Sequence, residues 1–172
     1  MTKKINTKFV KLIKYYSLIN HNLIYGNKSI NRYKNKDLVV TGNKKEQLNK
    51  LKKSINSIKN CTLKENATNL VFSDGNPESK IMIIGEGPGA NEDKEGLPFV
   101  GRAGQLLNKM LLSINLDRKN VYITNVVNYR PPENRKPTDE EIAKYLPYLT
   151  KHIEIIHPKI LILLGSTALN TI

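Results

Sequence analysis

The sequence is poor in residues that form covalent or metal cross-links, and it lacks long apolar runs. Its 172 residues include a single cysteine, Cys61, and no tryptophan. One cysteine excludes an internal disulfide and offers no cysteine cage for a metal ion. No apolar run approaches the ~18 residues of a membrane span, and no apolar segment near the basic N-terminus leads to a small-residue cleavage site. These absences favour a cytoplasmic protein with no membrane partner.

Acidic residues are scarce in the N-terminal third of the chain. Residues 1–60 hold 15 Lys and Arg against 2 Asp and Glu, whereas residues 61–172 hold 13 of each, so the net charge of +13 lies before residue 61. Such a segment can hold a phosphate backbone by releasing counterions. The alternative is a solvated basic face that reflects biased composition. Apolar residues at helical spacing predict a basic helical extension over 1–60, including a helix over 44–59, before a domain over 61–172.

The most informative stretch runs from Ile81 to Gly104. It opens with the apolar run 81–84, typical of a strand buried on both faces, and then breaks into the glycine-rich loop Gly85-Glu-Gly-Pro-Gly89. A strand, a glycine-rich loop and a helix, here predicted over 101–113, mark where open α/β sheets place ligands. The loop is not a P-loop, because no Gly-Lys-Ser/Thr follows it, and it lacks the three-glycine Rossmann spacing.

Two further buried strands are predicted at 120–127 and 159–165, and Val71-Phe72 is expected to pair briefly as a strand. Between the strands at 120–127 and 159–165, a proline-rich loop precedes a helix over 138–157, and that helix begins with a capping box. The helix over 101–113 is expected to turn four residues inward: Leu106, Leu107, Met110 and Leu111. This order of strands and helices predicts a parallel sheet with right-handed crossovers.

Because parallel strands end at one edge of their sheet, the predicted strand ends place Glu86, Asn125 and Phe99 around one pocket. An asparagine offers a donor and an acceptor side by side, Phe99 a stacking face, and loop amides donors to a developing anion. No Ser-His or Cys-His pair suggests a covalent nucleophile. His152 and His157 are expected at the surface and the C-terminal end of their helix. Such a pocket suits a planar polar base attacked by water.

Each of these side chains also has a structural alternative. Glu86 could cap the following turn, and Glu92 could be a solvated surface carboxylate. Phe99 could pack the loop onto the helix as a core residue. Asn125 could satisfy backbone groups at its strand end. The sequence leaves these alternatives open.

Several ordered motifs of the chain resemble those of type-4 uracil-DNA glycosylases. The resemblance covers about Cys61 to Ile172 and rests on four segments: Gly85-Glu-Gly-Pro-Gly89, Pro98-Phe-Val-Gly-Arg-Ala-Gly-Gln-Leu-Leu107, Val121-Tyr-Ile-Thr-Asn-Val-Val127 and Arg130-Pro-Pro-Glu-Asn-Arg135. It implies a three-layer α/β/α fold with a parallel central sheet. It also implies hydrolysis of the bond between uracil and deoxyribose, with the base flipped out of the DNA stack.

The resemblance also implies a role for each matching residue. It places Glu86 and Gly87 in the loop that activates water, Glu92 in the same pocket, Phe99 against the uracil ring and Asn125 on the uracil edge. The sugar would pass through an oxocarbenium-like state while loop dipoles stabilise the leaving anion. Three residues would lie near the DNA: Arg130, Asn134 and Arg135. The implied partner is uracil-containing DNA, and the implied state is a monomer.

The chain departs from the family at the positions of its cofactor. Type-4 enzymes usually hold a four-iron four-sulfur cluster on four cysteines. Cys61 matches one ligand, whereas Ile58, Tyr129 and Tyr145 stand at the other three positions. One thiolate cannot hold such a cluster, so no cofactor is expected. The two tyrosines are expected to fill the vacated space.

The family pattern also continues past the end of this sequence, with a further strand and a catalytic His-Pro motif. We therefore expect a C-terminally truncated domain that lacks its last strand, with an apolar sheet edge exposed and weak or absent activity. Two alternatives stay open beside a glycosylase. One is a non-catalytic nucleic-acid-binding remnant, and the other is an interaction module whose sheet a partner chain completes.

Overall fold

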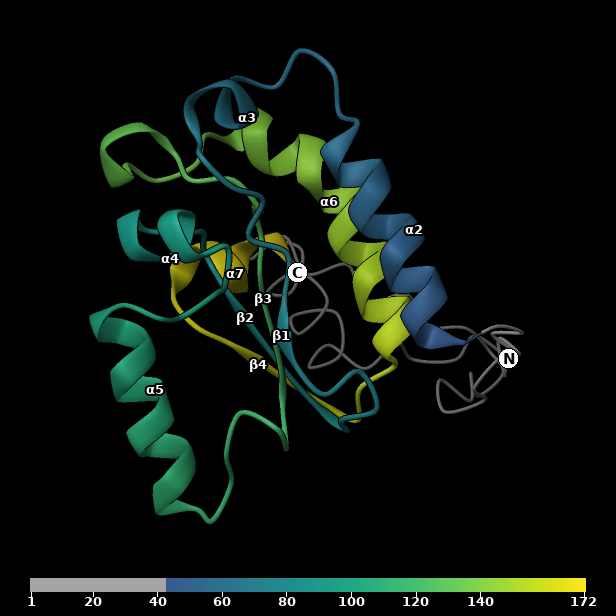
Figure 1. The fold of residues 1–172 in the computed structure, drawn as a ribbon, viewed down its shortest axis with the longest axis vertical. Coiled ribbons are helices and arrows are strands. Elements are labelled where there is room, and N and C mark those ends of the chain that lie inside the picture. The colour runs from purple at the N-terminus through teal and green to yellow at the C-terminus, as the bar shows by residue number, and fades with distance from the viewer. Residues whose placement is uncertain (1–42) are drawn as a thin grey trace, which may run out of the picture. The chain divides into compact units, whose positions relative to one another are not determined.

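The computed structural model describes residues 43–172 (Figure 1). Four strands form one sheet in the order β1-β3-β2-β4. Their bounds are β1 (Asp74–Gly75), β2 (Ile81–Gly85), β3 (Tyr122–Asn125) and β4 (Ile160–Leu163). β2 is parallel to both β3 and β4, and β1 runs antiparallel to β3. The three long strands thus confirm the predicted parallel arrangement, and β1 adds a short antiparallel edge.

Helices cover both faces of the sheet. They are α2 (Lys44–Asn56), α3 (Thr62–Asn66), α4 (Ala90–Glu95), α5 (Arg102–Ser113), α6 (Asp139–Ile156) and α7 (Ser166–Thr171), with a 3₁₀ turn, η1 (Pro132–Asn134). α2 and α6 lie side by side on one face and α5 lies on the other (Figure 1). The predicted capping box of Thr138 and Glu141 begins α6. Within residues 43–172, no helix is both long and apolar enough to cross a membrane.

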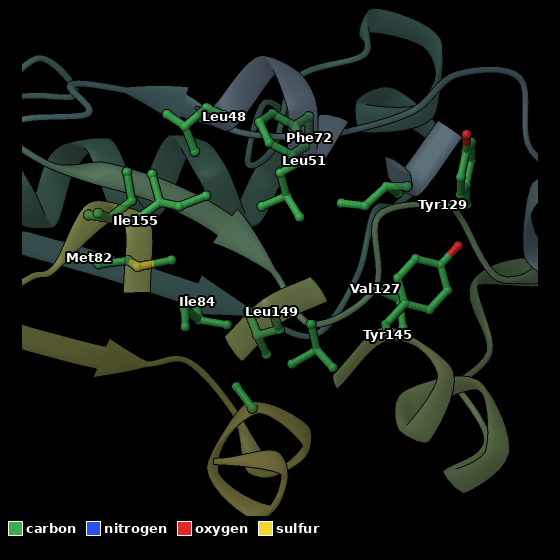
Figure 2. Close-up of a cluster of buried hydrophobic side chains, with 14 of the residues drawn as sticks. Leu48, Leu51, Phe72, Met82, Ile84, Val127, Tyr129, Tyr145, Leu149 and Ile155 are labelled. Atoms are coloured by element: carbon green, nitrogen blue, oxygen red, sulfur yellow. The ribbon is translucent and has the colours of Figure 1, made fainter. Parts of the chain in front are cut away.

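Alternating side chains of β2 divide the core into two clusters. Met82 and Ile84 face the larger cluster, formed with α2 and α6 (Figure 2), whereas Ile83 faces the smaller cluster with Leu107 and Leu111 of α5. Successive side chains of a strand point to opposite faces, so a strand that is apolar throughout needs cover on both. The two clusters confirm the three-layer α/β/α fold.

α2 is part of the α/β unit, although its sequence is as basic as the segment before it. Its apolar side chains Leu48, Leu51 and Ile55 are buried in the larger cluster (Figure 2). The described part of the compact unit therefore includes α2 and runs to Ile172. The rest of the predicted basic extension, up to residue 42, lies outside the described residues.

Three local predictions were wrong. β4 was expected to be a buried strand, but it is the outer strand of the described sheet, and Ile160 is 52 % exposed, so it forms the exposed apolar sheet edge that was also expected. Val71-Phe72 forms no strand, because its backbone is bonded to Asn128 and Thr124 instead, and pairing with β3 begins two residues later. On α5, the inward line is Leu107 and Leu111, four residues apart, while the adjacent line of Leu106 and Met110 is exposed.

His152 was expected on the surface of its helix, but it is only 2 % exposed. Its Nε2 lies 2.7 Å from the Tyr122 hydroxyl oxygen, and its ring stacks on Phe72 with centroids 4.7 Å apart. Tyr122 also donates a hydrogen bond to Ser73. Burial lowers the pKa of His152 to about 3, so the imidazole is neutral at physiological pH. His157, in contrast, lies at the C-terminal end of α6, as predicted, and its backbone there is left-handed.

We expect the free energy of unfolding to fall as the pH drops below 6.5. Between pH 6.5 and about 3 the unfolded chain binds a proton at residue 152 that the folded chain does not, so acid favours unfolding. From pH 7 to pH 5 the wild type should lose about 2 kcal/mol more than His152→Gln, which cannot titrate. Urea denaturation at both pH values measures the difference. The same pH dependence in both proteins would contradict a buried neutral histidine.

Candidate functional site

The candidate site lies where β2 and β3 end side by side, with Gly85 opposite Asn125. A Cβ atom placed on Gly85 would lie 2.5 Å from Cζ of Phe99 and 2.6 Å from Oδ1 of Asn125. Atoms cannot approach that closely, so only a glycine leaves room for both side chains. The structure thus brings the aromatic ring and the amide together at one strand end, as the strand order predicts.

Asn125 is nearly buried, yet its side-chain amide makes no hydrogen bond to any residue within 43–172. It is 3 % exposed. Asn128, at 4 %, instead donates to the Val71 carbonyl at 3.1 Å. In the described residues, no fully buried side-chain nitrogen or oxygen lacks a partner, so the Asn125 amide keeps some contact with solvent. An amide that has no protein partner and little contact with solvent is placed to hydrogen-bond the polar edge of a ligand.

Phe99 is half-buried and packs against the smaller core cluster, while the far end of its ring reaches Gly85. Its φ of 55° lies in the left-handed region, which is unusual for a bulky residue. The structure therefore combines features of both sequence interpretations, because one part of the ring packs on the core and another borders the site.

Glu86 follows β2 directly, and its backbone continues the pairing with the segment after β3. The amides of Val126 and Val127 donate to the carbonyls of Gly85 and Glu86 at 2.8 and 3.2 Å. Its carboxylate accepts a hydrogen bond from the hydroxyl of Thr167 on α7. The sequence did not indicate this contact, because the two residues lie 81 positions apart in the chain. A Cβ on Gly87 would lie 2.8 Å from Val127, which shows how closely this loop packs.

Glu92 joins the two loops of the site. Its carboxylate accepts hydrogen bonds from the backbone N–H groups of Gly89 (3.1 Å), Val100 (3.0 Å) and Gly101 (2.7 Å). It therefore holds the glycine-rich loop against the Phe99 loop, and it is not the free surface carboxylate of the alternative interpretation. A direct contact between Glu92 and a substrate stays a prediction.

Glu92→Gln should destabilise the protein by about 1–3 kcal/mol, because the new amide nitrogen would face a backbone N–H that needs an acceptor. Glu95→Gln is the matched control, since Glu95 is exposed and lies on the same short helix. Guanidinium denaturation of the two variants and the wild type measures the effect. Equal stability of both variants would show that the three backbone bonds do not hold the loops.

α4 itself was not predicted, because its residues are polar and have no apolar face. Asp93 holds it in place from a buried position. The carboxylate accepts hydrogen bonds from the backbone N–H groups of Thr68 (2.9 Å) and Asn69 (3.0 Å), and the Asn69 amide donates back to the Asp93 carbonyl at 2.7 Å. These bonds tie α4 to the segment before β1.

The proline-rich loop after β3 carries the three residues expected to contact nucleic acid. Arg130 donates a 2.8 Å hydrogen bond to the Asn134 side chain. Arg130 is partly exposed and Asn134 is exposed. Arg135 makes two bonds to Glu141, at 2.8 and 2.7 Å. These bonds raise the pKa of Arg135 and lower the pKa of Glu141. Nucleic-acid contacts of all three residues stay predictions.

The positions expected to replace the cluster ligands lie in the larger core cluster or pack against it (Figure 2). Cys61 is buried with its Sγ 3.3 Å from the Tyr145 hydroxyl, and Tyr129 donates to the Asn56 side chain at 2.9 Å. Burial raises the pKa of both tyrosines. A single cysteine sulfur beside two phenol side chains does not fit a four-iron cluster, which takes four cysteine ligands. The described part of the chain also holds no group of three or more His, Cys, Asp or Glu placed for a metal ion.

Comparison with known proteins relates the chain to one superfamily. Residues 72–172 match the family model of the uracil DNA glycosylase superfamily. The type-4 uracil-DNA glycosylase of Sulfurisphaera tokodaii is 50 % identical over 121 residues, which are 70 % of this chain and 55 % of that protein. The type-4 enzyme of Thermotoga maritima is 51 % identical over 110 residues, 64 % of this chain and 57 % of its own length. The chain thus spans just over half the length of these relatives.

Proposed function

Because the chain belongs to the uracil DNA glycosylase superfamily, we propose that it is a DNA-repair glycosylase that hydrolyses the bond between uracil and deoxyribose. The observation that carries the proposal is the nearly buried, unpaired amide of Asn125 beside the Phe99 ring. We further propose that it works as a cytoplasmic monomer. We also propose that it holds no iron-sulfur cluster, since Cys61 offers a single sulfur ligand and lies against Tyr145.

In the proposed complex, the flipped uracil stacks on the Phe99 ring and presents its edge to Asn125. Uracil offers an N–H donor next to carbonyl acceptors, and a side-chain amide offers the complementary acceptor and donor. An amide that already has no partner in the fold can bind the base without breaking a hydrogen bond of its own. The match between the hydrogen-bonding groups of uracil and those of the Asn125 amide supports the proposal that the ligand is a planar base with an amide-like edge.

In the proposed reaction, the oxygen of a water attacks C1′ of the sugar while the C1′–N1 bond breaks. The electron pair of that bond goes to uracil N1, and the water loses a proton to the Glu86 carboxylate or to solvent. Thr167 holds one oxygen of that carboxylate, which leaves the other able to orient the water. Positive charge on the sugar and negative charge on the base develop together, so a nearby carboxylate and a hydrogen-bonded base edge both lower the barrier.

A second candidate is a protein that binds nucleic acid without catalysis. It is favoured by a polar and basic hollow of about 470 Å³ beside α2, lined by Asn49, Lys52, Lys53, Asn56, Asn69 and Leu70. Within the described residues, neither Lys52 nor Lys53 forms a salt bridge, and the Lys52 ammonium lies 6.0 Å from the centroid of the Phe72 ring. Neither ammonium group thus has a carboxylate partner that a phosphate would have to displace.

The two candidates are separated by incubating the protein with single-stranded oligonucleotides that differ in one position, uracil or thymine. Alkali then cleaves any abasic site. The glycosylase proposal predicts cleavage only at the uracil. Salt-dependent binding to both oligonucleotides, with cleavage of neither, would contradict it and support the second candidate.

A further inference from the structure

The left-handed backbone of Phe99 needs support from its surroundings. Such a conformation is unfavourable for a non-glycine residue and persists only where neighbouring groups hold it. Glu92 binds the N–H groups that follow Phe99, at Val100 and Gly101. The carbonyl groups of Pro98 and Phe99 accept hydrogen bonds from a different partner.

That partner is Arg118, which lies in the turn between α5 and β3. Its Nη2 donates to the Pro98 carbonyl at 2.7 Å, and its Nη1 donates to the Phe99 carbonyl at 3.0 Å. One guanidinium therefore binds two consecutive carbonyls of the loop. The planar fork of an arginine suits this geometry, whereas a lysine ammonium is a point charge on a flexible stem.

Arg118 is itself anchored at two points. Its Nε donates to the Asp74 carboxylate at 2.6 Å in an ion pair whose side chains are 24 % and 31 % exposed, and Nη1 also contacts the Asn108 side chain at 3.2 Å. Asp74 belongs to β1 and pairs with Ile123 of β3, two residues before Asn125. Arg118 thus connects the loop that carries the aromatic ring to the strand that carries the free amide.

We propose that Arg118 is a positioning residue that holds the Phe99 ring in register with Asn125. The inference rests on the proposed function, from which the stacking role of the ring is taken. Arg118 touches no substrate in this account; it acts through the Pro98 and Phe99 carbonyls. A small displacement of the ring would misplace a stacked base against the attacking water, which is why the loss should appear in catalysis.

Three variants test this: Arg118→Ala, Arg118→Lys and the control Lys119→Ala, which removes an exposed charge from the next residue. Well below the melting temperature of each protein, both Arg118 variants should lose about 10²-fold in kcat/KM for uracil release, and the control about none. Added methylguanidinium should partly restore Arg118→Ala but not Asn125→Ala. Full activity in folded Arg118→Ala, or full rescue by lysine, would overturn the proposal.

A second measurement does not depend on activity. The chain has three phenylalanines, Phe9, Phe72 and Phe99, so 4-fluorophenylalanine gives three ¹⁹F signals, and Phe99→Leu assigns one of them. The Phe99 signal should shift or broaden in Arg118→Ala while the Phe72 signal stays. An unchanged Phe99 signal would overturn the positioning role even in a chain that releases no uracil. If the chain releases no uracil but the Phe99 signal shifts in Arg118→Ala, the glycosylase function is rejected and the positioning of the ring by Arg118 is supported.

Discussion

Asn125→Ala should lower the rate of uracil release by about 10²–10³-fold while leaving the fold intact, the loss typical of removing one catalytic hydrogen-bond group. The physical reason is that the Asn125 amide makes no hydrogen bond within the described residues. Its removal therefore leaves no partner unsatisfied. Activity should fall without a matching fall in the melting temperature.

Asn128→Ala is the matched control for this prediction. Asn128 is equally buried and only three residues away, but its amide is bonded to the Val71 carbonyl. Its removal should cost about 1–3 kcal/mol of stability, because a buried acceptor is left unpaired. Single-turnover base release and urea denaturation on both variants measure the two effects. If Asn125→Ala destabilises the chain as much as Asn128→Ala does, Asn125 has the structural role of its alternative interpretation.

Gly85→Ala should abolish measurable base release. The new Cβ would lie 2.5 Å from the Phe99 ring and 2.6 Å from Asn125 Oδ1, so the ring or the amide must move. Overpacking of this kind typically costs about 1–3 kcal/mol of stability. The displaced groups are the two proposed to hold the base, so the loss of activity should exceed the loss of stability.

A second substitution separates the two consequences. Gly85→Ala should lower the melting temperature less in a Phe99→Ala background than in the wild type, because the ring that clashes with the new Cβ is absent there. Base release should not recover, because the stacking face is gone. Near-normal activity in Gly85→Ala alone would mean that the strand end is not where the base binds.

Local patterns in the sequence predicted the elements that place the site. The apolar run 81–84 and the glycines after it set the end of β2, and the run around Ile123 set the end of β3. Because parallel strands end at the same edge, those two ends were enough to place Glu86 and Asn125 at one edge of the sheet, whereas Phe99 was added from the loop that follows. The capping box at Thr138 likewise marked the start of α6, since it depends only on residues three apart.

The contacts that were missed join residues far apart in the chain. Such contacts leave no periodic signal in the sequence, because a single charged or hydroxyl side chain looks the same whether or not it has a distant partner. The examples are Glu92 with Gly101, Asp74 with Arg118 and Glu86 with Thr167. His152 was missed for a different reason: helical spacing places it on the buried face of α6 with Tyr145, Leu149 and Ile156, but a histidine was interpreted as a polar surface residue. β4 was misjudged because apolar composition predicts a strand but not its place in the sheet.

The most direct test of the glycosylase account is the amount of free uracil that the wild type releases in a single turnover. Protein purified from a host without its own uracil glycosylase is mixed in excess with an oligonucleotide that carries one uracil, and the free base is measured by mass spectrometry. A glycosylase should release one equivalent of uracil per oligonucleotide. A folded protein that binds the oligonucleotide and releases no uracil would contradict it.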